Sequence, residues 1–205
     1  MTKPTVNTGT LEWSGEHWIN AISIDGENPS GWFSLFHTRY SEHGEGNTVH
    51  VFVPERGIDL VAADNGQLGD WMQHNFFQRT AMKAPLTPLV DAKFERRGTI
   101  HTDPSWVVQL PDSQVVARWF VQEAPVIAHG LFGEDAEFFT MLFFTAESAI
   151  ELDGEKVGGT PYQRDIWKAS IGGDRSSSVF ACSMTSIARW NISAMASASG
   201  WRSAC

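Results

Sequence analysis

Two histidines that a single hairpin could bring together are the first candidates for chemistry in this sequence. His37 falls in the predicted strand Gly31–Tyr40, and His50 falls in the next predicted strand, Thr48–Val53. A hairpin centred near His43–Gly44 places the two imidazoles opposite each other with Cβ atoms about 5 Å apart, whereas a shift of one residue places them on opposite faces. Imidazoles suit acid–base work near neutral pH. We therefore expect His37 and His50 to act as general base and general acid.

A second polar cluster places Tyr162, Arg164 and Asp165 within four positions of one another. In this hypothesis Asp165 orients one of the histidines, and Tyr162 donates a hydrogen bond to developing negative charge on oxygen. Arg39 lies two positions after His37, so alternation along a strand puts both side chains on one face. Arg39 is then placed to hold an anionic group of the substrate. The alternative for the cluster of Tyr162, Arg164 and Asp165 is a structural loop that is fixed by charge and aromatic packing.

A metal centre is an alternative use of the same histidines. His101 supplies a third imidazole from another predicted strand. Three histidines with one open coordination position form a hydrolytic or hydrating metal site. The leading hypothesis requires no metal and no cofactor, and in it His101 contributes to substrate binding instead.

The aromatic content indicates the class of ligand. The chain has 9 Trp and 13 Phe residues, and many of them fall in predicted strands. A small closed sheet either fills its interior with side chains or holds one small ligand. We expect Trp32, Phe52 and Trp119 to line a cavity for an apolar or aromatic small molecule. A solid aromatic core is the alternative.

Several classes of protein are excluded by composition and by missing motifs. The net charge is −9, which is opposite in sign to that of a non-specific nucleic-acid or anionic-membrane binder. No apolar run is long enough to span a bilayer, and the N-terminal residues contain no apolar secretion signal. The phosphate-binding loop, the dinucleotide-binding glycine motif, the nucleophile elbow and the paired-histidine zinc motif are all missing. Cys182 and Cys205 are expected to be free thiols of a cytoplasmic protein. Whether the chain forms a homodimer is left open by the sequence.

Short runs of β-branched and aromatic residues, separated by Gly, Asp, Asn and Pro, predict the elements that position these residues. The predicted strands are His17–Ile24, Gly31–Tyr40, Thr48–Val53, Ile58–Ala63, Ala92–Thr102, Ser105–Leu110, Gln114–Glu123, Glu137–Thr145, Ala149–Leu152 and Ser178–Ser183. Only Leu68–Arg79 shows the apolar periodicity of a helix. Two hairpin turns are expected, at Pro111-Asp112-Ser113 and at Asp153-Gly154. Val126–Phe132 is expected to be an apolar loop.

Many short strands with a single helix indicate an all-β fold, and we predict an antiparallel β-barrel. Closure of the barrel also removes exposed strand edges. Residues 1–182 are predicted to form one domain, followed by a Ser/Ala-rich tail over residues 183–205. The alternative for this tail is a terminus that docks on a partner through Trp190 and Trp201.

The predicted architecture resembles the lipocalin-like (calycin) barrels over roughly residues 13–183. Gly15-Glu16-His17-Trp18 is similar to the glycine–tryptophan motif of the first strand, with one residue more between the two. Thr102-Asp103-Pro104 approximates a second motif without its tyrosine, and Arg189-Trp190 resembles the closing arginine. The resemblance implies a barrel that binds hydrophobic molecules. A minority of such proteins catalyse hydration, isomerisation or cyclisation.

The leading hypothesis is therefore a cofactor-independent lyase, hydratase or isomerase that acts on a hydrophobic or aromatic small molecule in the barrel cavity. His37, His50, Asp165 and Tyr162 are its expected catalytic residues. The first alternative is a non-catalytic carrier or sensor of a hydrophobic ligand. The second is the metal-dependent enzyme.

Overall fold

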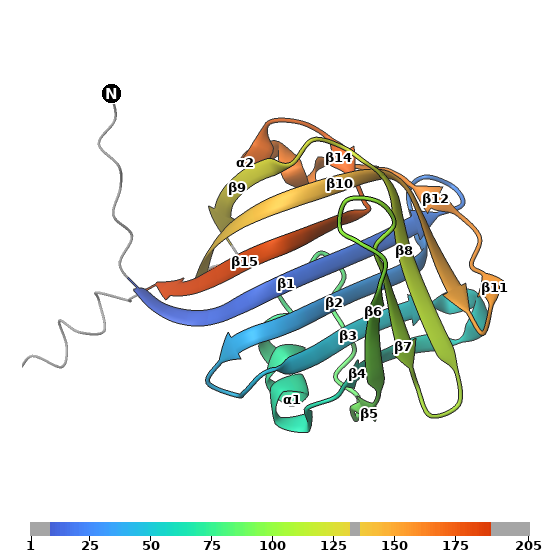
Figure 1. The fold of residues 1–205 in the computed structure, drawn as a ribbon, viewed down its shortest axis with the longest axis horizontal. Helices are drawn as coiled ribbons and strands as arrows, with labels where there is room; N and C mark the ends of the chain where they lie inside the picture. The colour runs from blue at the N-terminus through green and yellow to red at the C-terminus, as the bar shows by residue number, and fades with distance from the viewer. Residues whose placement is uncertain (1–8, 132–135, 190–205) are drawn as a thin grey trace, which may run out of the picture.

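The long strands of the chain form one sheet that curls into a nearly closed barrel (Figure 1). The computed structural model describes residues 9–131 and 136–189. Around the barrel the order is β5-β4-β3-β2-β1-β15-β10-β8-β7-β6. The strands on this path are β1 (Gly9–Ser23), β2 (Pro29–Ser41), β3 (Gly46–Val53), β4 (Ile58–Ala63), β5 (Val90–Asp91), β6 (Lys93–Arg97), β7 (Ser105–Gln109), β8 (Gln114–Gln122), β10 (Ala136–Leu152) and β15 (Val179–Arg189).

Shorter elements decorate this path. β9 (Val126–Leu131) and β11 (Glu155–Lys156) pair with β10, and β12 (Thr160–Pro161) pairs with β1. A separate ladder joins β13 (Gln163–Arg164) to β14 (Arg175–Ser176). The helical elements are η1 (Pro54–Arg56), α1 (Gly66–Asn75), η2 (Asp165–Trp167) and α2 (Lys168–Ile171). Within the described ranges, no helix has the length and apolar character needed to cross a bilayer.

The barrel stays open along one seam, between β5 and β6. These two strands are the edges of the sheet and follow each other in the chain, separated only by Ala92. The Ala92 N–H donates to the Ala63 carbonyl at 3.0 Å, which holds the seam to β4. Elsewhere each strand pairs with its neighbours in the sheet, in the antiparallel sense except between β4 and β5, which leaves few free edges, as expected for a barrel.

Aromatic rings fill the middle of the barrel interior. Trp18 stacks on Phe180 with ring centroids 4.4 Å apart, and Phe143 stacks on the same ring at 5.1 Å. Trp119 meets Trp18 edge-on at 5.2 Å. Trp18, Trp119 and Phe180 are completely buried, and they belong to one core with Phe33 and other inward-facing side chains. The solid aromatic core therefore accounts for this region, and alternation along the strands places its members inside.

A second core lies on the opposite face of the sheet. Helix α1 begins at Gly66 and is preceded by Asn65, whose side-chain oxygen accepts a hydrogen bond from the Leu68 N–H at 3.2 Å and so caps the first turn. Leu68 and Met72 project from one face of α1 and are buried with Trp13 and Phe36 of β1 and β2. The helix thus packs its apolar face, which the periodicity of the sequence predicts, on the outer face of the sheet.

The predicted all-β barrel class is confirmed, with adjustments to single elements. Strand β4 has the predicted bounds, and the predicted helix is two residues earlier at its start and ends at Asn75. The hairpin turn at Asp153-Gly154 forms with φ of 53° and 82° at the two residues, the left-handed conformation expected of this dipeptide.

Three expectations about elements are wrong. The predicted loop Val126–Phe132 contains β9, because its backbone pairs with β10. Glu137–Thr145 and Ala149–Leu152 belong to one strand, β10, rather than two. Strand β15 continues to Arg189, so the first part of the expected tail belongs to the barrel. Trp190 and Trp201 lie outside the described residues.

Candidate functional site

His37 and His50 lie on opposite faces of the sheet, so the expectation that they share one face is wrong. In the β2–β3 ladder, His37 is opposite Asn47 and His50 is opposite Ser34. Successive side chains of a strand point to alternate faces, and His50 is three positions from Asn47. The two imidazoles therefore cannot act on the same bound molecule from one face of this hairpin.

His50 is part of the buried outer layer. Its imidazole is 1% exposed, and its Nε2 lies 2.9 Å from Oδ1 of Asp59 on the neighbouring strand. Burial lowers the pKa of His50, and the hydrogen bond with Asp59 opposes that shift only in part. The Nδ1 atom has no partner within the described part of the chain. This arrangement is that of a neutral, packed side chain.

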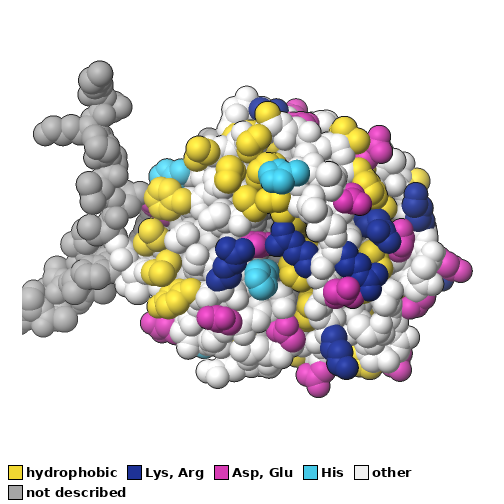
Figure 2. Space-filling view, in the orientation of Figure 1, with side chains coloured by type: hydrophobic (Ala, Val, Ile, Leu, Met, Phe, Trp, Pro, Cys, Tyr) yellow, Lys and Arg dark blue, Asp and Glu magenta, His cyan; other side chains and the backbone are white. Residues whose placement is uncertain are grey.

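His37 and Arg39 lie at a different place, beside the buried carboxylate of Glu16. The Nδ1 of His37 is 2.8 Å from Oδ1 of Asn47, and Arg39 forms an ion pair with Glu16. The Glu16 carboxylate is 2% exposed and also accepts hydrogen bonds from Arg96 at 3.0 Å and from the Trp18 indole at 2.9 Å. Basic side chains gather around an acidic side chain and a histidine at the centre of the face in Figure 2. The Arg39 guanidinium was expected to hold an anionic group of the substrate, but it is already paired with Glu16.

The remaining predicted binding residues are dispersed. His101 is exposed between β6 and β7, and Phe52 is half-buried opposite Trp32 in the β2–β3 ladder. Trp119 is completely buried in the barrel, where its indole N–H donates to the Ile19 carbonyl at 2.8 Å. In the parts of the chain that the structure describes, no group of three His, Cys, Asp or Glu side chains is arranged to hold a metal ion.

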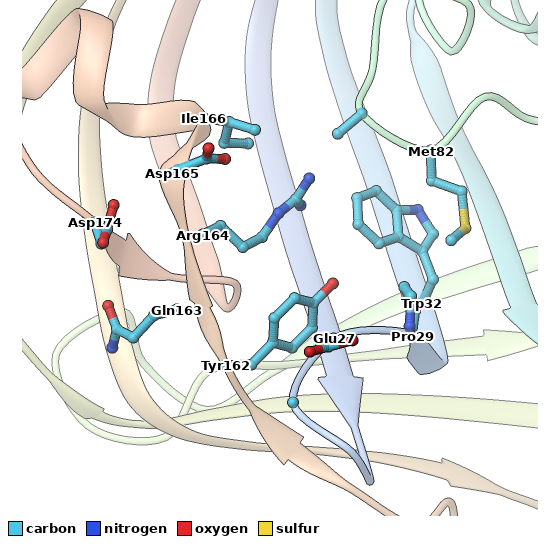
Figure 3. Close-up of a pocket in the computed structure, with 12 residues that line it drawn as sticks. Glu27, Pro29, Trp32, Met82, Tyr162, Gln163, Arg164, Asp165, Ile166 and Asp174 are labelled. Carbon is cyan, nitrogen blue, oxygen red and sulfur yellow. The ribbon is translucent and has the colours of Figure 1, made fainter.

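A different cleft brings three of the predicted residues together. Two adjoining cavities, of about 480 Å³ and about 570 Å³, lie on the outer side of the sheet and share four lining residues, Trp32, Ala81, Arg164 and Ile166. We call the pair the outer cleft. Tyr162 and Asp165 line the smaller cavity with Trp32 (Figure 3). His37 and His50 line neither cavity.

The larger cavity of the outer cleft is mainly apolar. Its lining includes side chains of β1, β10 and β15, namely Ile19, Phe138, Leu142, Val179, Ala181 and Met184. One wall is formed by the segment 79–81, and the other by β9 together with Arg164 and Ile166. Outward-facing apolar residues of three neighbouring strands therefore form a surface that α1 does not cover.

His17 is a polar member of the apolar cavity. Its Nε2 lies 2.9 Å from the Ser34 hydroxyl, and its ring stacks on Phe36 with centroids 3.8 Å apart. Burial lowers the pKa of His17 to about 3, because a charged imidazole is disfavoured where water is excluded. The ring is therefore neutral at physiological pH and adds little charge to the cavity.

The smaller, polar cavity is built on the segment that follows β12. The Tyr162 N–H donates to the Ser177 hydroxyl at 3.0 Å, and Ser177 in turn donates to the Ala21 carbonyl of β1. These bonds fix the segment on the barrel, and Tyr162 and Arg164 point from it toward Trp32 (Figure 3). The Arg164 guanidinium lies 5.4 Å from the centroid of the Trp32 ring, a cation–π contact.

Burial perturbs both of these side chains. It raises the pKa of the Tyr162 hydroxyl, with a nearby opposing effect of the Arg164 charge, so the phenol stays protonated at neutral pH. It also lowers the pKa of Arg164, which nevertheless remains charged. The cavity therefore presents a phenol donor and a guanidinium donor next to the exposed carboxylate of Asp165.

Arg164 and His17 line the cleft but were not predicted as site residues. A signal for Arg164 was present, because it stands two positions after Tyr162 and shares a strand face with it. No local signal marked His17, whose place in the cleft depends on packing between distant segments.

The chain was also compared with known proteins. Comparisons with protein-family models, with curated proteins and with solved structures find no match.

Proposed function

We propose that the protein is a carrier or sensor that binds a small apolar or aromatic molecule in the outer cleft. The observation that carries this proposal is the junction of an apolar cavity with a polar one at Trp32 and Arg164. Ligand sites are commonly concave, mostly apolar and supplied with a few polar groups that fix the orientation of the ligand. The outer cleft has all three properties.

The position of the site differs from what the lipocalin-like resemblance implies. We propose that the protein is similar to the lipocalin-like barrels only in its barrel architecture and in the class of ligand, a hydrophobic molecule. The rings of Trp18, Trp119 and Phe180 pack against one another in the interior, whereas the apolar cavity of about 570 Å³ lies outside the sheet. A volume of this size is in the range of small-molecule sites, which is about 300–1,000 Å³.

Obstruction of the cleft tests this proposal. Ala81 is exposed and lines both cavities, so Ala81→Trp introduces an indole at their junction with little effect on the core. We expect the variant to bind the fluorescent probe N-phenyl-1-naphthylamine at least tenfold more weakly than the wild type. Ala124→Trp is the matched control, because Ala124 is exposed and lines neither cavity. Equal binding by all three proteins, or no binding by the wild type, would contradict the proposal.

A second candidate is acid–base catalysis in the same cleft, as a lyase or isomerase. It is supported by the shared cavity of Tyr162 and Asp165. A protonated Tyr162 hydroxyl can donate to developing charge on a substrate oxygen while the Asp165 carboxylate accepts a proton. His37 and His50 do not take part in catalysis in this second candidate, because they line neither cavity.

Turnover separates the two candidates. A bound molecule is incubated with the protein and followed by mass spectrometry. For a catalyst, Asp165→Asn should abolish product formation while binding persists. Asp174→Asn is the control, because Asp174 lines the same cavity but pairs with Lys168 at 3.1 Å. Absence of product with the wild type leaves the carrier as the function.

A further inference from the structure

We propose that the ligand of the outer cleft is an organic carboxylate, whose anionic group pairs with Arg164 while its apolar body lies in the apolar cavity. This inference depends on the proposed function, because it specifies the ligand of the same cleft. It assigns Arg164 as the residue that selects for negative charge.

Arg164 differs from the other arginines whose side chains are described. Seven of them form ion pairs with a glutamate, namely Arg39, Arg56, Arg79, Arg96, Arg97, Arg118 and Arg175. The side chain of Arg164 has neither a hydrogen bond nor an ion pair with any residue in the described ranges, although it is partly buried and the charge of the neighbouring Asp165 acts on it. A guanidinium with five N–H donors that is partly removed from water is ordinarily paired. The missing partner is an acceptor that the ligand can supply.

The fold holds Arg164 ready for such a partner. Its backbone pairs with Arg175 in the β13–β14 ladder, and its guanidinium rests over the Trp32 ring. The side chain therefore loses little freedom when a carboxylate arrives, and a planar guanidinium binds a carboxylate through two parallel hydrogen bonds. The Tyr162 hydroxyl points into the same cavity and offers a further donor (Figure 3).

Acidic side chains around the cavity restrict which anions can bind. Glu27, Asp165 and Asp174 line it, and all three are exposed. Asp174 pairs with Lys168, and no ion pair in the described ranges joins the other two to Arg164. These carboxylates and the net charge of −9 repel small free anions. An anion is retained only when burial of its apolar part adds to the binding, so the site favours amphiphilic carboxylates over inorganic ions.

Three matched probes test the inference by isothermal titration calorimetry of the full chain. 4-Phenylbutyrate has both an aromatic body and a carboxylate, 4-phenylbutyramide keeps the body without the charge, and acetate keeps only the charged group. We expect the carboxylate to bind at least tenfold more tightly than the amide, and acetate to bind too weakly to measure. In Arg164→Gln, the preference for the carboxylate should disappear, and the affinity for the amide should change less than threefold.

Arg56→Gln is the matched control, because it removes the same charge from an exposed arginine outside both cavities. It should keep the wild-type preference. Equal affinity of the wild type for carboxylate and amide overturns the inference but leaves the proposed function intact. Binding of neither aromatic probe contradicts the proposed function itself. Loss of the preference in Arg56→Gln as well would show that overall charge, rather than Arg164, selects the ligand, and would also overturn the inference.

Discussion

At the scale of single residues, Glu16 shows how a charge is kept inside this barrel. Its carboxylate is 2% exposed and is surrounded by donors from three strands: Trp18 on β1, Arg39 on β2 and Arg96 on β6. Arg96 also lies over the Trp18 ring, 4.9 Å from its centroid. Strands β1 and β6 are not neighbours in the sheet, so the Arg96–Glu16 ion pair connects two strands across the barrel.

We predict that Glu16→Gln destabilises the protein by about 1–3 kcal/mol, since it leaves two guanidinium groups without their counter-charge. Both arginines are partly exposed, and water compensates for part of the loss. Urea unfolding measures the effect. Glu95→Gln is the control, because both side chains of the Glu95–Arg97 pair are exposed to water and the pair should contribute little. Similar unfolding midpoints for the two variants would contradict the prediction.

His17 predicts a loss of stability in mild acid. Its pKa of about 3 in the folded chain is below the ordinary value of 6.5, so the unfolded chain binds the proton more readily. The contribution of His17 to stability is therefore full above pH 6.5 and falls as the pH decreases toward 3, by up to about 1.4 kcal/mol per pH unit. Burial lowers the pKa of His50 as well, which acts in the same direction.

Urea unfolding at pH 7.5 and pH 5.5 tests this expectation. The wild type should lose about 1 kcal/mol more than His17→Gln between the two pH values, because the variant lacks the titrating group. The comparison is of the pH dependence within each protein, so a lower absolute stability of the variant does not affect it. An identical loss in both proteins would show that His17 does not contribute.

Three residues singled out in the sequence line the outer cleft. Tyr162 and Asp165 were predicted from the polar cluster, whereas Trp32 was predicted as an aromatic residue that lines a cavity inside the barrel. The faces of the sheet to which His37 and His50 point could not be predicted, because they depend on the residues at which the hairpin turns. A pairing of the two would centre the hairpin at His43–Gly44, but the observed pairs, such as Thr38 with Gly46, centre it one to two residues earlier.

At the scale of elements, helix α1 contains two glycines in opposite situations. A Cβ atom added at Gly69 would lie 2.6 Å from the Cβ of Ala63 and 3.0 Å from Leu89, closer than packed atoms allow. A Cβ added at Gly66 would meet nothing within 4 Å. Gly69 therefore sets how closely α1 approaches the end of β4.

We predict opposite effects of the same substitution in this helix. Gly69→Ala should destabilise the protein by about 1–3 kcal/mol, because overpacking displaces the helix from the sheet. Gly66→Ala should be neutral or stabilising by up to about 1 kcal/mol, because alanine favours the helix. Thermal unfolding of the two variants measures the difference. A stabilised Gly69→Ala variant would show that helix propensity outweighs the close contact.

Most strands could be predicted from alternation and turns, and two strand ends that were missed have a common cause. The beginning of β1, Gly9–Glu16, and the end of β15, Ser183–Arg189, are rich in Gly, Ser and Thr and resemble loops in the sequence. In the structure they pair with each other, with Gly9 opposite Arg189. Their strand conformation comes from a partner about 170 residues away rather than from local preference.

At the scale of the whole molecule, the sheet separates two cores. The inner core centres on Phe180, which stacks with Trp18 and Phe143. The outer core lies between the sheet and α1 and includes Phe36 and Met72. One layer of backbone thus supports packing on both sides, and the loss of either core should affect the same set of strands.

We predict that Phe180→Ala destabilises the whole barrel by about 3–5 kcal/mol, because it opens a cavity in the middle of the inner core. Leu86→Ala is the control, since Leu86 is 64% exposed, and its effect should be within about 0.5 kcal/mol. Urea unfolding followed by tryptophan fluorescence and by far-UV circular dichroism should give one transition for each variant. Transitions that do not coincide would indicate that the two cores unfold separately.

The location of the outer cleft has a consequence for how such a protein can change over evolutionary time. Part of its lining belongs to the long strands β1, β10 and β15, and another part comes from the segment 79–81 and from residues 162–166, which lie outside the long strands of the barrel. Substitutions there can alter ligand preference without disturbing the stacked rings of the interior. A barrel with an internal ligand must satisfy recognition and folding with the same side chains, whereas here these two segments line the cleft without belonging to the inner core. Specificity is therefore free to diverge while the scaffold is kept.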